Sequence, residues 1–135
     1  MTEDVDAALD PFLQAVLGKQ AMHVVALDVS ELTSIADVFI ICSGRSNRQV
    51  SAIAEHIEKQ LRGHKIKPLS VEGTAEGHWV LIDYGYVIIH VFFEPVREFY
   101  DLEGLWSDAR RIPIPAAPQT KAAAGRRTRS PDNED

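Results

Sequence analysis

Residues 77–93 read GHWVLIDYGYVIIHVFF, and this stretch decides the fold. Two runs rich in aliphatic residues flank Tyr84-Gly85, a pair suited to a tight turn because glycine readily adopts a positive φ. We therefore expect a β-hairpin in which Asp83 lies opposite Tyr86 and Trp79 lies opposite His90. Side chains alternate between the two faces of a strand, so the residues on each face follow from this register.

The two faces of the predicted hairpin differ in character. One face is almost purely aliphatic and should lie beneath helices. The other mixes large aromatic residues with an acid and an imidazole, and holds Trp79, Leu81, Asp83, Tyr86, Ile88, His90 and Phe92. Aromatic side chains are enriched in protein interfaces, and an exposed aromatic patch is uncommon on a monomer. Two interpretations stay open: a docking surface, or packing under the last helix with His90 as a core histidine.

The chain on either side of the hairpin predicts a mixed α/β fold. Before it we expect a helix that starts at Asp10 as N-cap, strands over 22–29, 38–43 and 69–72, and a helix from the SNRQ capping box at 46–49 to about residue 62. After it we expect one final helix over 94–106, with Phe99, Leu102, Leu105 and Trp106 facing inward. The fold class is thus a mixed sheet of about five strands flanked by helices.

Length and composition bound the remaining possibilities. With 135 residues, 45% hydrophobic and 25% charged, the chain is long enough to form one globular domain, which we place at residues 1–110. A disordered tail is expected over residues 111–135. The single cysteine, Cys42, excludes an internal disulfide framework, and the acidic N-terminus does not resemble a signal peptide. We expect a cytoplasmic protein without a membrane-spanning segment.

The charge is unevenly divided along the chain. Residues 1–110 carry 9 Lys and Arg against 17 Asp and Glu, a net charge of −8, whereas residues 111–135 carry 5 against 3, a net charge of +2. Protein affinity for nucleic acid comes mainly from cations that neutralise phosphates, so a domain this acidic is a poor candidate for binding a phosphate backbone, and we expect no direct sequence-specific nucleic-acid partner. It favours a basic partner instead.

The sequence shows no strong catalytic or metal-binding motif. The predicted register puts His78 and His90 on opposite faces, so they would not share a metal, and Cys42 lies inside an apolar strand. The loop from Gly44 to Gln49 leads into a helix N-terminus that could favour an anion, but it lacks the P-loop lysine. We expect no enzymatic activity, no cofactor and no metal, and keep a nucleotide-binding or nucleotidyltransferase-like enzyme at this loop as the alternative. A third reading is RNA binding through the GRRTR segment of the tail.

Three segments resemble the ribosomal silencing factor family, also called the Iojap-like family. They are ALDVSELTSIADVFIICSGRSNRQVSAIAEHIE, VEG, and GHWVLIDYGYVIIHVFFEPVREFYDLEGLW, and the resemblance as a whole covers about residues 8–108. The resemblance implies a nucleotidyltransferase-like fold without the catalytic carboxylates. It also implies a cytoplasmic translational repressor, often a homodimer, that binds ribosomal protein number fourteen of the large subunit and sterically blocks joining of the small subunit in stationary phase.

The resemblance also implies a set of partner-binding residues. Trp79 and Asp83 match the family's W-x-x-x-D pattern, and the remaining positions along the hairpin and last helix are Leu81, Tyr86, His90, Phe92 and Tyr100. Family members commonly have an acid where Tyr86 stands and an aromatic residue where Val38 stands. If that acid contacts the basic ribosomal protein, Tyr86 replaces a charge interaction with packing.

Overall fold

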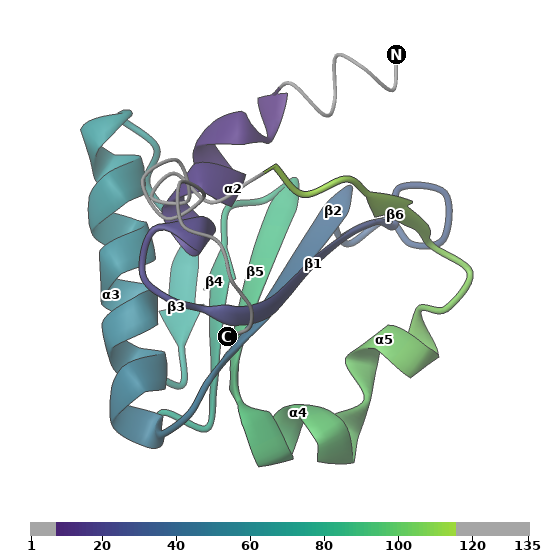
Figure 1. Cartoon of the computed structure of the whole chain (residues 1–135). Helices are drawn as coiled ribbons and strands as arrows, with labels where there is room; N and C mark the ends of the chain where they lie inside the picture. The colour runs from purple at the N-terminus through teal and green to yellow at the C-terminus, as the bar shows by residue number, and fades with distance from the viewer. Residues whose placement is uncertain (1–7, 116–135) are drawn as a thin grey trace, which may run out of the picture.

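The computed structural model describes residues 8–115 and arranges them as one mixed sheet with helices on both faces (Figure 1). In chain order the elements are α2 (Asp10–Leu17), β1 (Met22–Asp28), β2 (Val38–Gly44), α3 (Asn47–Gly63), β3 (Ser70–Glu72), β4 (Trp79–Asp83), β5 (Val87–Phe93), α4 (Glu94–Tyr100), α5 (Leu102–Leu105) and β6 (Arg110–Ile112). The strand order is β3-β4-β5-β2-β1-β6. The predicted mixed α/β class is confirmed.

The sheet has six strands and not about five, because the short strand β6 pairs with β1. This pairing carries the sheet to Ile112, which is 3% exposed, two residues past the domain boundary expected at residue 110. From residue 116 onward, the predicted disordered tail lies outside the described residues. Within residues 8–115 no helix has the length and apolarity needed to cross a membrane.

The centre of the sheet is the parallel pair β2 and β5, in which nearly every side chain is buried. Alternate residues point to two separate cores, as the two-residue period of a strand requires. Ile40, Cys42 and Ile89 belong to the larger core under α2 and α3, whereas Phe39 and Phe92 belong to the smaller core on the other face. Burial raises the pKa of the Cys42 thiol to about 12, consistent with the packing role expected for it.

Helix α3 begins as its sequence predicts. The Ser46 hydroxyl accepts a hydrogen bond from the Gln49 backbone N–H at 3.0 Å, and the Gln49 side chain accepts one from the Arg45 backbone N–H. The apolar stripe of the helix is buried against the sheet and consists of Val50, Ile53, Ala54, Ile57 and Leu61. For α2 the prediction was wrong in detail, because Leu9 takes the N-cap position and Asp10 is already helical.

The hairpin of β4 and β5 forms, but its register differs from the predicted one by two residues. Trp79 pairs with Phe92 and Asp83 pairs with Ile88, and the Tyr84 N–H donates to the Val87 carbonyl at 2.8 Å, so the turn residues are Gly85 and Tyr86, one residue later than predicted. A shift of two residues leaves the side chains of the paired strand residues on their predicted faces. The prediction was wrong for Tyr86, which lies in the turn and packs against Phe12 on the other side of the sheet.

The single helix predicted over 94–106 is two short helices joined at Asp101, which adopts a left-handed conformation with φ of 48°. Because of this break, the side chains of α5 point in directions that a continuation of α4 would not give them. Leu102 and Trp106 pack on the smaller core as predicted. Phe99 and Leu105, expected to face inward, are 81% and 74% exposed.

Candidate functional site

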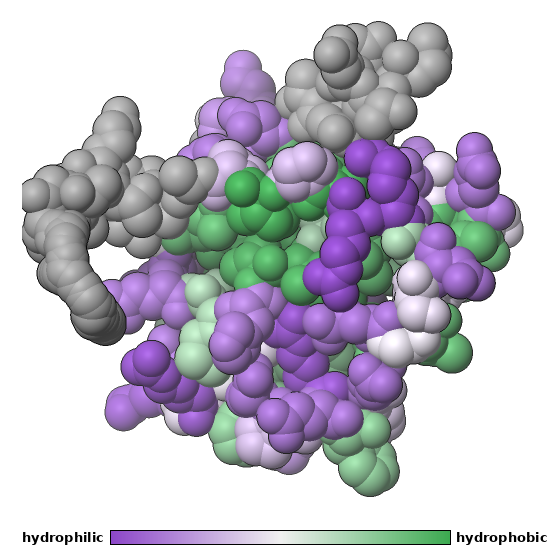
Figure 2. Space-filling view, turned by 45° about the vertical axis from the view of Figure 1, so that its right-hand side comes forward, coloured by the Kyte–Doolittle hydropathy of each residue, from purple (hydrophilic) through white to green (hydrophobic). Residues whose placement is uncertain are grey.

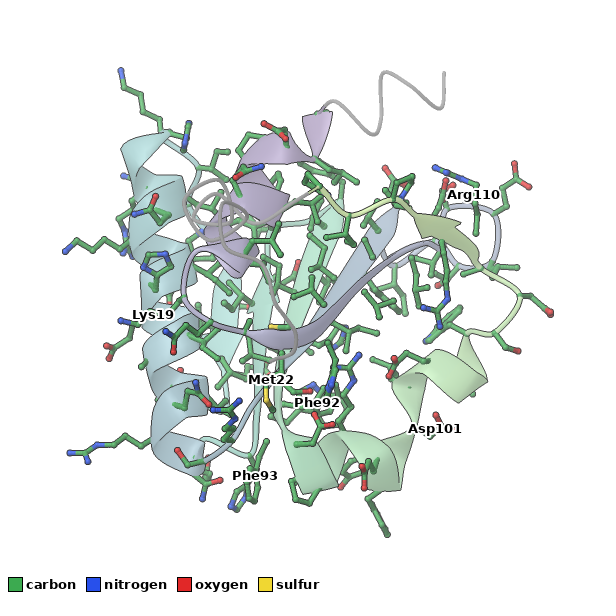
Figure 3. All side chains as sticks on the ribbon, in the orientation of Figure 1. Lys19, Met22, Phe92, Phe93, Asp101 and Arg110 are labelled. Atoms are coloured by element: carbon green, nitrogen blue, oxygen red, sulfur yellow. The ribbon has the colours of Figure 1, made fainter. Side chains whose placement is uncertain are left out.

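The Trp79 indole lies at the margin of the smaller core, where the sheet meets α4. It is half-buried, with its ring centroid 4.8 Å from that of Phe92 and 5.1 Å from that of Tyr100. Phe92, placed between the sheet and α4 in Figure 3, is completely buried and supports the indole from beneath. Tyr100 flanks the indole and is 54% exposed. Trp79 is thus rigidly supported while part of it stays open to solvent.

His90 fixes the orientation of Trp79. Its imidazole is 5% exposed, and its Nδ1 accepts a hydrogen bond from the Trp79 Nε1–H at 3.1 Å. The neutral ring therefore carries its proton on Nε2, an atom that has no hydrogen-bond partner within the described structure. Burial lowers the pKa of His90 to about 4, which keeps the ring neutral at physiological pH.

Two shallow hollows meet at Trp79. One, of about 370 Å³, is lined by His78, Trp79, Pro95, Val96, Phe99 and Tyr100. The other, of about 310 Å³, is lined by Glu72, Gly73, Trp79 and Leu81. The indole therefore stands as a ridge between two mainly apolar hollows, one beside α4 and one beside β3. We call the residues Trp79, Leu81, Val96, Phe99 and Tyr100 the Trp79 surface.

Helices α4 and α5 are attached to the sheet by a buried arginine. The Arg97 side chain is 6% exposed, and its Nη1 donates to the Ser43 hydroxyl at 2.7 Å. Its Nε and Nη2 donate to the two carboxylate oxygens of Glu103 at 3.0 and 2.9 Å. These hydrogen bonds lower the pKa of Glu103. Arg97 thus joins the end of β2, α4 and α5, and so holds Phe99 and Tyr100 beside Trp79.

The sequence-predicted site residues separate into three groups in the structure. Trp79, Leu81 and Tyr100 share one surface, as expected. His90 and Phe92 lie beneath that surface, so they support the site and do not reach a docked partner directly.

Asp83 and Tyr86 form the third group, and they lie at the turn that joins β4 to β5. The Asp83 carboxylate accepts a hydrogen bond from the Gly85 N–H at 2.8 Å. Tyr86 is 48% exposed, and its ring lies 5.7 Å from that of Phe12 in α2. Phe12 belongs to the larger core, so Tyr86 packs on the opposite side of the sheet from Trp79. Val38, the other departure from the family pattern, is a fully buried core residue.

Sequence reasoning missed Phe99, Leu105 and Arg97. The exposure of Phe99 and Leu105 depends on the left-handed backbone of Asp101, and aspartate adopts that conformation only occasionally. The local signal for this break is weak: Asp101 precedes Gly104 by three residues, and its carboxylate accepts from the Gly104 N–H at 3.2 Å. Figure 2 shows apolar side chains reaching the surface among hydrophilic ones on the side of the molecule turned toward the viewer.

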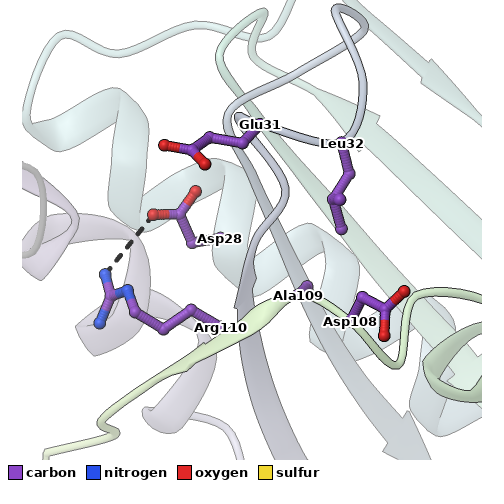
Figure 4. A pocket seen from close by; sticks show the side chains of 6 residues that line it. All are labelled: Asp28, Glu31, Leu32, Asp108, Ala109 and Arg110. Carbon is purple, nitrogen blue, oxygen red and sulfur yellow. Dashed lines mark ion pairs between the residues drawn. The ribbon is translucent and has the colours of Figure 1, made fainter.

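A separate depression, of about 310 Å³, lies near the β1–β6 edge and is lined by Asp28, Glu31, Leu32, Asp108, Ala109 and Arg110 (Figure 4). One of its acids, Asp28, is already engaged by neighbouring residues. Asp28 accepts hydrogen bonds from Ser30 and lies 3.6 Å from the Arg110 guanidinium, and the hydrogen bond from the Ser30 side chain is the main cause of the lowered pKa of Asp28. No group of three His, Cys, Asp or Glu within residues 8–115 could hold a metal ion.

The loop from Gly44 to Gln49 has a packing explanation. A Cβ atom at Gly44 would lie 3.0 Å from the Val50 side chain and 3.1 Å from its backbone nitrogen, so glycine permits close contact between β2 and the first turn of α3. The side chains of Ser46 and Gln49 are engaged in the capping box. These contacts account for the motif without a bound nucleotide.

Comparisons with known proteins agree on one family. Residues 2–135 match the family model described as ribosomal silencing factor during starvation. The chain is 42% identical over 102 residues to a ribosomal silencing factor of Halalkalibacterium halodurans, covering 76% of this chain and 87% of the relative. It is 44% identical over 91 residues to the one of Bacillus subtilis, covering 67% and 77%. A crystal structure of a Bacillus halodurans protein superimposes with a TM-score of 0.67 at 40% identity, covering 74% of this chain and 93% of that one.

Proposed function

The chain belongs to the ribosomal silencing factor family, and we propose that it represses translation by docking its Trp79 surface on ribosomal protein number fourteen of the large subunit. The docked protein would occupy the face that the small subunit needs for joining. Repression of this kind is steric and needs no catalytic turnover. A factor that acts on ribosomes in this way works in the cytoplasm, in starvation or stationary phase.

The observation that supports this proposal is the position of Trp79. The indole is held from beneath by His90 and Phe92 and stands between two hollows that a partner's side chains can fill. Rigid, partly exposed aromatic residues are the usual energetic centres of protein interfaces. The exposed acids Glu72 and Glu76 lie on β3 and on the β3–β4 connection, where they favour approach of a basic protein.

The experiment is sedimentation of the full chain with isolated large and small ribosomal subunits. We expect co-migration with the large subunit alone, and fewer joined ribosomes when both subunits are supplied. Trp79→Ala should weaken large-subunit binding by about 2 kcal/mol or more, which is roughly 30-fold. Co-migration with the small subunit, or wild-type binding by this variant, would contradict the proposal.

We also propose that the protein forms a homodimer in the absence of ribosomes. Leu69 is 75% exposed next to β3, a three-residue strand at the edge of the sheet, and an exposed sheet edge is a surface on which another chain can pair. Sedimentation equilibrium of wild-type protein and of Leu69→Glu tests this. A monomeric wild type, or a dimer that Leu69→Glu leaves intact, would count against this arrangement.

A further inference from the structure

The positive charges of the folded domain are concentrated at one helix. Seven of the nine Lys and Arg side chains within residues 1–110 lie on α3, just beside it, or at the end of α2, namely Lys19, Arg45, Arg48, Lys59, Arg62, Lys65 and Lys67. Residues 45–67 contain only two acids, Glu55 and Glu58. The acidic character expected for the domain as a whole therefore does not extend to this helix.

The basic residues of α3 project away from the core. Its apolar stripe is fully buried on the sheet, and the positions opposite that stripe are Arg48, Ala52, Glu55, Lys59 and Arg62. Arg48, Lys59 and Arg62 are exposed. With a rise of about 1.5 Å per residue, this outward row spans roughly 21 Å. Figure 3 shows nitrogen-tipped side chains along the outer side of α3, with Lys19 beside it.

A hollow of about 250 Å³ lies on this face and is lined by Lys19, Ala52, Glu55, His56 and Lys59. Neither Lys19 nor Lys59 forms an ion pair with a carboxylate of residues 8–115. Burial, followed by the charges of Lys19 and Lys59, lowers the pKa of His56. The two ammonium groups therefore flank a shallow space that an anion of phosphate size can enter.

The chemistry of this face selects among anionic partners. An interfacial membrane helix needs a free apolar face, whereas the apolar stripe of α3 is buried. Binding of single strands relies on aromatic side chains that stack on bases, and α3 contains no Phe, Tyr or Trp. What remains is a face with three exposed cations, Arg48, Lys59 and Arg62, which suits successive phosphates of a duplex, although Arg62 also lies 3.9 Å from Glu58. Screening within about 10 Å at 0.1 M salt separates this face from the acids across the sheet.

We propose that the outer face of α3, together with Lys19, binds the phosphate backbone of double-helical RNA without reading its bases. This surface lies on the side of the sheet covered by α2 and α3, opposite the smaller core that supports Trp79. The protein would then carry two separate contact surfaces, one for a basic protein and one for RNA. Binding to RNA alone needs no ribosome, so it can be tested separately from docking on the large subunit.

The test is fluorescence anisotropy of a labelled 20-base-pair RNA duplex titrated with the full chain at 50 and 200 mM salt. We expect affinity that falls with salt and is the same for two unrelated duplex sequences. The double variant Lys19→Glu with Lys59→Glu should weaken binding at least tenfold and reduce the slope of log K against log salt by about two. Absence of RNA binding by the wild type, or wild-type binding by the double variant, would overturn the proposal.

A gain in affinity distinguishes a binding surface from a folding defect. Glu55→Gln removes the acid that lines the hollow and should tighten RNA binding about two- to threefold. Glu31→Gln makes the same change in the exposed connection between β1 and β2, which Figure 1 shows on the side of the molecule away from α3, and should leave the affinity unchanged. If Glu55→Gln and Glu31→Gln changed the RNA affinity equally, binding would depend on the net charge of the protein and not on α3, and the proposal would be overturned.

Two further experiments test whether the tail binds the RNA and whether the protein binds membranes instead. Replacement of Arg126, Arg127 and Arg129 by alanine should leave at least half of the RNA affinity, whereas complete loss would assign binding to the tail and overturn the proposal. Vesicles containing a third of anionic phosphatidylglycerol should not bind the protein at 100 mM salt. Binding to vesicles without binding to the duplex would identify a membrane surface instead.

Discussion

The Trp79 Nε1–H donates a hydrogen bond to the Nδ1 of His90 at 3.1 Å, linking an indole at the surface to an imidazole in the core. The two residues are diagonal neighbours on β4 and β5, since Trp79 pairs with Phe92 and Leu81 pairs with His90. Phe39 and Phe92 enclose the imidazole further, with ring centroids 5.0 and 6.2 Å away. The geometry of the Trp79 surface therefore depends on a neutral histidine.

Stability should fall at acidic pH because of His90. Its pKa is about 4 in the folded protein and near 6.5 when unfolded, so the unfolded state binds more protons between these values. The contribution of His90 is complete above pH 6.5 and is lost as pH falls toward 4. Between pH 7.5 and 5.0 this loss amounts to about 2 kcal/mol. Urea unfolding of wild type and His90→Asn at both pH values measures it, and equal pH dependence in the two proteins would contradict the assignment.

Trp79→Phe isolates the hydrogen bond from the packing. The phenyl ring retains contact with Phe92 and Tyr100 but leaves the buried His90 Nδ1 without a donor, so the free energy of unfolding should drop by about 1–3 kcal/mol. Adding His90→Leu removes the unpaired atom and should restore part of that loss. A double-mutant cycle measured by urea unfolding gives the coupling free energy between Trp79 and His90. If the losses in free energy of unfolding were strictly additive, the two side chains would not be coupled.

Tyr100→Ala and Tyr86→Ala form a matched pair for the Trp79 surface. The two tyrosines are similarly exposed, at 54% and 48%, but Tyr100 flanks Trp79 whereas Tyr86 contacts Phe12 on the other side of the sheet. We expect Tyr100→Ala to weaken large-subunit binding by about 1 kcal/mol or more and Tyr86→Ala to leave it unchanged. The reverse order of effects in a sedimentation titration would move the docking surface to the α2 side.

Arg97→Met should be among the most destabilising single changes in the protein. It leaves the partly exposed Glu103 carboxylate and the buried Ser43 hydroxyl without their shared donor, and each group left unsatisfied costs about 1–3 kcal/mol. Glu103→Gln keeps one oxygen that can accept from Arg97, so it should lower the free energy of unfolding less than Arg97→Met does. The pKa of Glu103 is lowered in the folded protein, so its contribution is present at neutral pH and is lost as pH falls through its folded-state pKa. Urea unfolding at pH 7 would contradict this prediction if Arg97→Met matched the wild type.

Asp101 combines an unusual backbone conformation with a capping side chain. Asn tolerates the left-handed region and retains an acceptor for the Gly104 N–H, so Asp101→Asn should change the stability by less than about 0.5 kcal/mol. Asp101→Ala loses both features and should lower it by about 1–2 kcal/mol. Thermal unfolding of the two variants should rank them in this order. Equal melting temperatures would show that the junction of α4 and α5, visible in Figure 3, tolerates rearrangement.

Periodicity and local hydrogen bonding explain the correct sequence predictions. The faces of the hairpin follow from the alternation of Trp79, Leu81 and their neighbours, and an even register shift leaves that alternation intact. The start of α3 follows from a capping box closed within four residues, between Arg45 and Gln49. Each of these signals is contained in a few consecutive residues.

The incorrect predictions involve interactions between residues distant in sequence, or a single backbone torsion. β6 is three residues long and forms by pairing with β1, so Arg110–Ile112 carries little strand signal of its own. The break at Asp101 is one φ angle within a stretch whose composition suits a continuous helix. Arg97 reaches Ser43 across 54 positions of sequence, a distance that no local pattern encodes.

The parallel pairing of β2 with β5 joins strands about fifty residues apart in the chain, and both lie at the centre of the sheet. This pairing slows folding, because the chain between the two strands must lose conformational entropy before the contacts of β2 with β5 can compensate for it. A nascent chain still lacking Val87–Phe93 therefore contains the antiparallel pairs β1–β2 and β3–β4 but not the strand that joins them into one sheet. The complete sheet can therefore assemble only after Val87–Phe93 has been synthesised.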